Sequence, residues 1–154
     1  MHLQKEQKTN ISKTISTNKN PHSISIVAWN IQGLGMKLST PKVQKVLSST
    51  DVIILSETWT DRNENPPGID GYQTWHFPSS FKHPRAFRSC GGQIIYISNK
   101  VGKGISIVKN ICDHFVVLKF DKNYFFTEND MYIICCYLAP DGTTYVCTTC
   151  CGSY

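Results

Sequence analysis

Two polar side chains, Asn30 and Glu57, each stand at the end of a short hydrophobic run, and both are of a type that can do chemistry. Asn30 closes the run Ile24–Trp29, and Glu57 comes just after Val52–Leu55. An uncompensated carboxylate held near a buried edge costs on the order of several kcal/mol. Glu57 therefore needs a cation, and a metal ion bound to phosphate would supply one. This pattern predicts a phosphodiesterase site.

The elements that position these side chains form a strand, a helix and a strand. Ile24–Trp29 reads as a buried strand, and Thr40-Pro41 opens a helix with an N-cap residue followed by proline. Asp51–Ser56 is the next strand, so a parallel βαβ unit is expected, with Asn30 and Glu57 at the carboxyl ends where the chemistry of open α/β sheets gathers. Apolar positions at spacings i, i+3 and i+4 predict one buried helix stripe: Val43, Val46 and Leu47.

The rest of the chain reads mainly as strands, after a loop at Asp61–Gly71. Lys100–Gly104 and Asp121–Asn123 are expected to be hairpin connections. Together with the βαβ start, this pattern predicts an α/β fold in which a mixed sheet carries helices on its outer face. The expected strands are rich in Ile, Val, Tyr and Phe: Gln93–Ser98, Ile105–Ile111, His114–Phe120, Tyr124–Phe126 and Met131–Leu138.

Length and composition limit the class of protein. A chain of 154 residues has room for one domain or for part of a larger one. No stretch approaches the roughly 18 apolar residues of a membrane span, and no secretory signal is visible. Residues 1–23 read as a disordered polar leader rich in Ser, Thr, Asn and Lys. An intracellular protein, nuclear or cytoplasmic and not secreted, is expected.

Seven cysteines in a chain without a visible secretion signal are expected to be reduced thiols. Three of them, Cys147, Cys150 and Cys151, lie in residues 141–154, which read as an irregular tail. Their spacing is that of metal ligands, but a structural zinc site needs four ligands and no histidine is near. A poorly ordered chain end is the other interpretation.

A basic stretch is the clearest feature of the charge distribution. The chain carries a formal net charge of +5, and the residues from Gly71 to Cys112 include no Asp or Glu. Within it, Lys82, Arg85 and Arg88 alternate with aromatic residues and proline. Such a loop suits a nucleic-acid backbone, with basic groups neutralising phosphate and aromatic rings packing on a sugar or base. An ordinary solvated basic loop is the alternative.

Four short motifs in this order resemble the endonuclease/exonuclease/phosphatase superfamily. They are Trp29-Asn30-x-x-Gly33, Ser56-Glu57-Thr58-Trp59, Gly91-Gly92 and Tyr137-x-x-Pro140. Within the superfamily the chain is most similar to the endonuclease domains of non-LTR retrotransposons, which themselves resemble apurinic/apyrimidinic endonucleases. The resemblance covers residues 24–140. It implies an incomplete four-layer α/β sandwich, the N-terminal half of that fold.

The resemblance also implies roles for individual residues in Mg²⁺-dependent nicking of DNA by phosphodiester hydrolysis. Asn30 would help to organise the hydrolytic centre, and Tyr137 would contact the scissile phosphate. Glu57 would bind Mg²⁺, but with Glu57 as the single carboxylate this binding is expected to be weak or absent in the fragment. Gln32 stands where several relatives have an aspartate, which makes this half of the site less electronegative. No membrane or small-molecule cofactor is implied.

Each of these three residues also has a plainer interpretation. Asn30 could simply turn the chain after a strand, because Asn tolerates turn conformations. Glu57 could pair with Arg62 or with a lysine. Tyr137 could be a core aromatic residue whose hydroxyl is hydrogen-bonded.

Two motifs of the superfamily have no match in this sequence, namely Gly-Asp-Phe-Asn and Ser-Asp-His. General acid–base groups and electrostatic stabilisers contribute about 10²–10⁴-fold each, so the expected activity of this chain is very low. One half of the fold is also expected to leave an apolar sheet face uncovered and to self-associate. A non-catalytic nucleic-acid-binding fragment and a phospholipid or inositol-phosphate phosphatase are the alternative functions.

Overall fold

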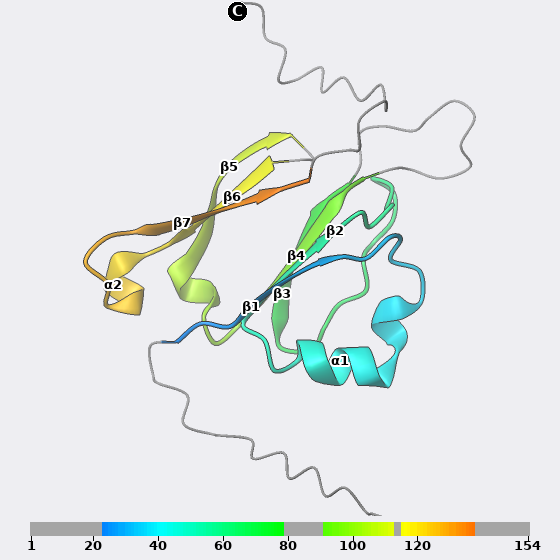
Figure 1. Cartoon of the computed structure of the whole chain (residues 1–154), viewed down its shortest axis with the longest axis horizontal. Helices are drawn as coiled ribbons and strands as arrows, with labels where there is room; N and C mark the ends of the chain where they lie inside the picture. The colour runs from blue at the N-terminus through cyan, green and yellow to red at the C-terminus, as the bar shows by residue number, and fades with distance from the viewer. Residues whose placement is uncertain (1–22, 79–90, 113–114, 138–154) are drawn as a thin grey trace, which may run out of the picture.

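The computed structural model describes residues 23–78, 91–112 and 115–137. This part of the chain forms two sheets, one of four strands and one of three (Figure 1). In chain order the elements are β1 (Ile26–Asn30), α1 (Pro41–Leu47), β2 (Val52–Ser56), β3 (Tyr72–Phe77), β4 (Gln93–Ser98), β5 (Ile105–Cys112), β6 (Phe115–Phe120), α2 (Lys122–Phe125) and β7 (Met131–Cys136).

The four-stranded sheet has the strand order β1-β2-β4-β3. Its first two strands are parallel and are joined through α1, so the predicted βαβ unit is confirmed. The other strand pairs, β2 with β4 and β3 with β4, are antiparallel. The strand β1 lies at the edge of this sheet, where Ile26 is 41% exposed and Trp29 is 38% exposed.

Alternating side chains of the central strands belong to two separate cores. Ile53 and Leu55 of β2 pack with Leu38 and Leu47, from the β1–α1 connection and α1. Val52 of β2, which points to the other face, packs with residues of β5, β6 and β7. Figure 1 shows this layering, with α1 on one side of the four-stranded sheet and the second sheet on the other. Both faces of the four-stranded sheet are therefore covered.

The three-stranded sheet, of order β5-β6-β7, is covered on one face only by the described residues. Val116 and Leu118 of β6 are fully buried against the four-stranded sheet. On the outer face Val108, Tyr132 and Ile134 are 53%, 56% and 65% exposed. Among the described residues, the apolar sheet face without a covering layer is therefore that of the second sheet.

Two predictions about local structure are wrong. Val46, expected in the buried stripe of α1, is 62% exposed, because the short helix buries only Leu47 fully. Tyr124–Phe126, expected to be a strand, lies in and just after α2. The Asp121 carboxylate caps that helix by accepting hydrogen bonds from the backbone N–H groups of Asn123 (2.8 Å) and Tyr124 (3.0 Å).

The strand pattern differs from prediction in two further places. β3 was not predicted, although it pairs with β4 along its whole length. Lys100–Gly104 is not a hairpin connection, because it carries the chain from β4 in one sheet to β5 in the other. The single mixed sheet is therefore replaced by two packed sheets, as the resemblance implied.

Several predictions concern segments that lie outside the described residues. These are the polar leader up to residue 22, His114, Pro140, the tail of residues 141–154, and the basic residues Lys82, Arg85 and Arg88. Within the described ranges, no helix is long and apolar enough to cross a membrane.

Candidate active site

The carboxyl ends of β1 and β2 continue side by side beyond the sheet. Asn30 is paired with Ser56 in the strand register, and the Ile31 N–H donates to the Ser56 carbonyl at 2.9 Å. One step further, the Gly33 N–H donates to the Glu57 carbonyl at 2.7 Å. The loops that carry Asn30 and Glu57 are therefore tied together by backbone hydrogen bonds.

Glu57 and Tyr137 are in direct contact. The Tyr137 hydroxyl donates to Oε1 of Glu57 at 2.7 Å, and both groups are partly buried. Tyr137 follows β7 of the three-stranded sheet, whereas Glu57 follows β2 of the other sheet. The site is thus built where the two sheets meet. Within the described ranges Glu57 forms no ion pair with Arg62 or with a lysine.

Asn30 stabilises the turn after β1 through its side-chain oxygen, and its side-chain NH2 group remains available as a donor. Its Oδ1 accepts a hydrogen bond from the Gln32 N–H at 3.2 Å, as the turn interpretation expects. Gln32 has a φ of +48°, a conformation uncommon for a residue other than glycine. Nδ2 of Asn30 donates to no described group, so it can donate to an incoming oxygen atom.

Lys37 holds the same turn from the other side. Its ammonium group donates to the Ile31 carbonyl and, at 2.9 Å, to the Gln32 carbonyl. Gln32 itself is exposed and uncharged. The β1 half of the site therefore carries a lysine and no carboxylate, whereas the β2 half carries Glu57.

The loop after β2 has an unusual backbone that the Gly91-Gly92 motif explains. Glu57 and Trp59 have φ values of +53° and +57°. The N–H groups of Thr58 and Trp59 donate to the Gly92 and Gly91 carbonyls at 3.3 and 2.9 Å. Both glycines have φ near +80°, a conformation that glycine adopts more readily than other residues. The motif thus supplies the backbone acceptors that hold the Glu57 loop.

Trp59 also packs on the turn after β1. A Cβ atom on Gly33 would lie 2.3 Å from Cε3 of Trp59, so the indole ring occupies the space that a side chain would need. A pocket of about 340 Å³ lies beside this contact. Its lining comes from both loops: Gly33, Leu34, Gly35, Thr58, Trp59, Thr60 and Glu64.

A chain of side-chain hydrogen bonds runs from this loop to β3. Oγ1 of Thr58 lies 2.9 Å from Oγ1 of Thr60, which lies 2.8 Å from Nε2 of His76. Burial lowers the pKa of His76, and the nearby Glu64 carboxylate raises it by a smaller amount, leaving it below its ordinary value. This shift favours the neutral imidazole at pH 7.

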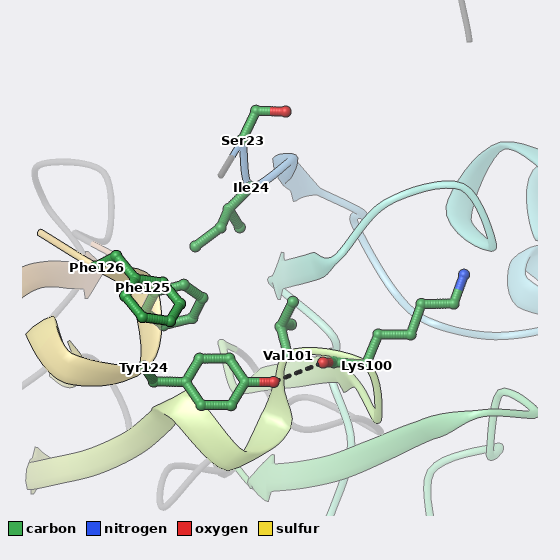
Figure 2. Close-up of a pocket in the computed structure, with 7 residues that line it drawn as sticks. All are labelled: Ser23, Ile24, Lys100, Val101, Tyr124, Phe125 and Phe126. Atoms are coloured by element: carbon green, nitrogen blue, oxygen red, sulfur yellow. Dashed lines mark hydrogen bonds between the residues drawn. The ribbon is translucent and has the colours of Figure 1, made fainter. Parts of the chain in front are cut away.

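A second pocket, of about 330 Å³, lies at the opposite end of the strands (Figure 2). There the Tyr124 hydroxyl donates to the Lys100 carbonyl at 2.8 Å. None of the predicted site residues lines it. Its lining residues are Ser23, Ile24, Lys100, Val101, Tyr124, Phe125 and Phe126.

Comparison with solved structures shows what this arrangement resembles. The AP endonuclease LMAP from Leishmania major superposes with a TM-score of 0.58 and 18% sequence identity, over 75% of this chain and 40% of that one. This chain has part of the endonuclease/exonuclease/phosphatase fold. A variant of the 3′ phosphatase NExo from Neisseria, bound to a product DNA hairpin, gives a TM-score of 0.46 and 16% identity, over 73% of this chain and 40% of that one.

The chain thus spans about 40% of the length of both of these structures. No protein-family model matches the sequence, and no curated protein matches it. At this level of identity the comparison establishes the fold alone.

The residues present fit a Mg²⁺ ion held jointly with a phosphate. Mg²⁺ is commonly bound by one or two carboxylates, by waters and by substrate phosphate. Glu57 offers one such carboxylate, because no described group hydrogen-bonds to its Oε2. Over the described ranges no group of three or more His, Cys, Asp or Glu side chains could hold a metal ion. An all-protein cage is therefore not what these residues form.

Four residues of this region were not predicted from the sequence. They are Lys37, Thr58, Thr60 and His76. His76 lies on β3, which was itself missed. The Thr58-x-Thr60 spacing gave no usable signal, because Trp59 between them has a φ of +57° and the segment is not an extended strand.

Proposed function

We propose that this chain supplies the metal- and phosphate-binding part of a Mg²⁺-dependent DNA endonuclease of the retroelement type. The observation that carries the proposal is the 2.7 Å hydrogen bond from Tyr137 to Glu57, at the carboxyl end of β2. It brings together the two residues that the resemblance assigns to metal and phosphate. The Ser56–Trp59 motif is the reason to favour the retroelement branch.

The roles of this chain's own residues follow from their atoms. A phosphate at the carboxyl ends of β1 and β2 would meet the Nδ2 donor of Asn30. The Tyr137 hydroxyl has a single proton, which it donates to Glu57, so it would donate to the phosphate only by giving up that hydrogen bond. Glu57 would hold Mg²⁺ through a carboxylate oxygen, and Tyr137 would orient that carboxylate. A bound Mg²⁺ would neutralise charge on the phosphate and polarise its P–O bonds.

Turnover by this chain alone is expected to be low or absent. No residues here match the superfamily's Gly-Asp-Phe-Asn and Ser-Asp-His motifs, which position the attacking water and stabilise the transition state. Gln32 also leaves Glu57 as the one carboxylate among the residues that the resemblance assigns to this site. Mg²⁺ and DNA should therefore bind cooperatively, because each supplies part of the other's site.

Binding of a fluorescent DNA duplex, with Mg²⁺ or with EDTA, tests the proposal. We expect Mg²⁺ to strengthen binding, and Glu57→Gln to abolish that gain. Tyr137→Phe should weaken Mg²⁺-dependent DNA binding by about 10–100-fold, the factor that corresponds to the loss of one hydrogen bond to a charged group. Glu128→Gln changes an exposed carboxylate in the loop between α2 and β7 and should have no effect.

The outcomes separate the candidate functions. DNA binding that ignores Mg²⁺ and is unchanged by both Glu57→Gln and Tyr137→Phe would overturn the proposal. A plasmid-nicking assay run in parallel measures turnover, and nicking that survives Glu57→Gln would come from a contaminating nuclease. Binding without nicking is the expected result. Activity confined to lipid or inositol phosphates would favour the phosphatase alternative.

A further inference from the structure

The side chains of Thr58, Thr60 and His76 form a hydrogen-bonded series in the interior, beside the candidate site. Thr58 is 1% exposed and Thr60 is 3% exposed. The Oγ1 atoms are 2.9 Å apart, and Oγ1 of Thr60 lies 2.8 Å from Nε2 of His76. Buried hydroxyl groups need partners, since a buried donor without an acceptor destabilises the fold.

The number of available acceptors determines which group donates and which accepts in each of these two hydrogen bonds. Thr60 is the single hydrogen-bond partner of the Thr58 hydroxyl within the described ranges, so Thr58 must donate to Thr60. The Thr60 proton is then directed to Nε2 of His76, which must be unprotonated. The imidazole is thereby required to be neutral, with its proton on Nδ1. A proton on Nε2 would give three donor protons for two contacts, and so would leave the proton of either Thr58 or Thr60 without an acceptor.

This hydrogen-bonded series is anchored next to a strained part of the backbone. Glu57 and Trp59, on either side of Thr58, have φ values of +53° and +57°. Such conformations are strained in residues other than glycine and persist where surrounding contacts enforce them. The side chains of Thr58 and Thr60 are tied to β3, while their loop is tied to Gly91 and Gly92 through the backbone.

We infer that His76 is a positioning residue for Glu57. As an acceptor at Nε2 it holds Thr60 and Thr58, and so keeps the Glu57 carboxylate facing Tyr137. The consequence for metal binding rests on the proposed function of Glu57, whereas the hydrogen-bond direction and the loop conformation do not.

The surroundings of His76 support a neutral acceptor. Strand β4 places Ile94 opposite it in the register, and the loop before β3 contributes the Glu64 carboxylate. Burial outweighs that carboxylate and lowers the pKa of His76. Protonation at acidic pH should therefore release the loop.

The tautomer of His76 is the first test. In the full chain labelled with ¹⁵N, NMR at neutral pH should show Nδ1 protonated and Nε2 with the shift of an unprotonated, hydrogen-bonded nitrogen. Thr60→Ser keeps the hydroxyl and should preserve this tautomer. Thr60→Val keeps the shape of the side chain but removes the hydroxyl, so the preference of His76 for this tautomer should be lost. A proton on Nε2 in the wild-type protein would overturn the inference.

The conformation of Glu57 is the second test. Its ¹³Cα and ¹³Cβ shifts and its HN–Hα coupling report a positive φ, which His76→Leu should shift toward extended values. His76→Gln supplies an amide oxygen as acceptor and should restore the positive φ, now independent of pH between about 5 and 8. A Glu57 φ unchanged in His76→Leu and Thr60→Val would overturn the positioning role.

A Mg²⁺ titration distinguishes failure of this inference from failure of the proposed function. If Glu57 binds Mg²⁺, His76→Leu should weaken Mg²⁺-dependent DNA binding, by up to the roughly 10–100-fold that follows loss of a direct hydrogen-bond partner of a metal ligand. His76→Gln should restore that binding. A wild-type chain with the expected tautomer and φ but no response to Mg²⁺ would refute the proposed function and leave His76 as a positioning residue.

Discussion

Cys135 and Cys136 are adjacent on β7 but differ in their surroundings. Cys135 is 5% exposed, and burial raises the pKa of its thiol from 9.0 to about 11, whereas Cys136 is exposed. Because the thiolate is the nucleophile, a rise of that size lowers its neutral-pH population by about 100-fold. Iodoacetamide should therefore alkylate Cys136 well before Cys135, as tandem mass spectrometry can locate. Equal rates in the folded protein would contradict this, and equal rates in urea are the control.

Asp130 makes folding stability depend on pH. Lys119 donates to its Oδ2 at 2.9 Å and the Lys122 N–H donates to its Oδ1 at 2.9 Å, which lowers its pKa from 3.8. A carboxyl group whose pKa is lower in the folded state stabilises above its unfolded pKa, and this is lost as pH falls through the folded value. The urea concentration at which half of the protein is unfolded should therefore decrease when the pH is lowered below about 4.

Asp130→Asn should reduce that acid-induced fall, because the amide does not titrate. Asp70→Asn, an exposed residue of the loop before β3, is the matched control. An unchanged pH dependence in Asp130→Asn would show that other carboxyl groups account for it.

At the scale of elements, the close approach of two loops depends on Gly33. Its φ is +89°, and an added Cβ would lie 2.3 Å from the Trp59 ring. Gly33→Ala should destabilise the protein by about 1–3 kcal/mol, as overpacking does, and should displace the indole. Urea unfolding measures the loss, and the tryptophan emission spectrum reports the displacement.

Gly35→Ala is the control for this prediction. Gly35 also has a positive φ, of +41°, but nothing lies within 4 Å of an added Cβ. Both substitutions strain the backbone, and Gly33→Ala alone adds the clash. Equal destabilisation by the two would mean that the Trp59 contact is unimportant.

The elements that were predictable are those with a strong local signal. The hydrophobic runs of β1 and β2 and the Thr40-Pro41 start of α1 identified the βαβ unit. The prediction of a strand at Tyr124–Phe126 was wrong because these residues have a strand-like composition, whereas the Asp121 cap favours the short helix α2. β3 was missed because Tyr72–Phe77 mixes polar and aromatic residues, and its place is set by pairing with β4.

The roles assigned to Asn30, Glu57 and Tyr137 stay predictions, and only part of their arrangement in space was predictable from the sequence. Asn30 and Glu57 stand at predicted strand ends, so their proximity followed from a parallel pair. Tyr137 lies 80 residues beyond Glu57, and their hydrogen bond depends on how the two sheets pack. His76 needed the same tertiary information, because its partner Thr60 lies in a loop.

At the scale of the whole molecule, the outer face of the β5–β6–β7 sheet should drive self-association. Val108, Tyr132 and Ile134 are each more than half exposed on it. Exposed apolar side chains that gather on one face form the kind of patch that marks an interaction surface or an aggregation site. The double substitution Val108→Lys/Ile134→Lys should shift sedimentation velocity profiles toward monomer, because two charges would have to be desolvated in any contact.

Val46→Lys separates this face from a general effect of added charge. Val46 is 62% exposed on α1, which covers the opposite side of the four-stranded sheet. Its substitution should leave self-association almost unchanged, although it also adds a positive charge to a chain of net charge +5. If it disperses the protein as well as the double substitution does, net charge drives the effect. If neither does, the exposed edge strand β1 is the surface to change next.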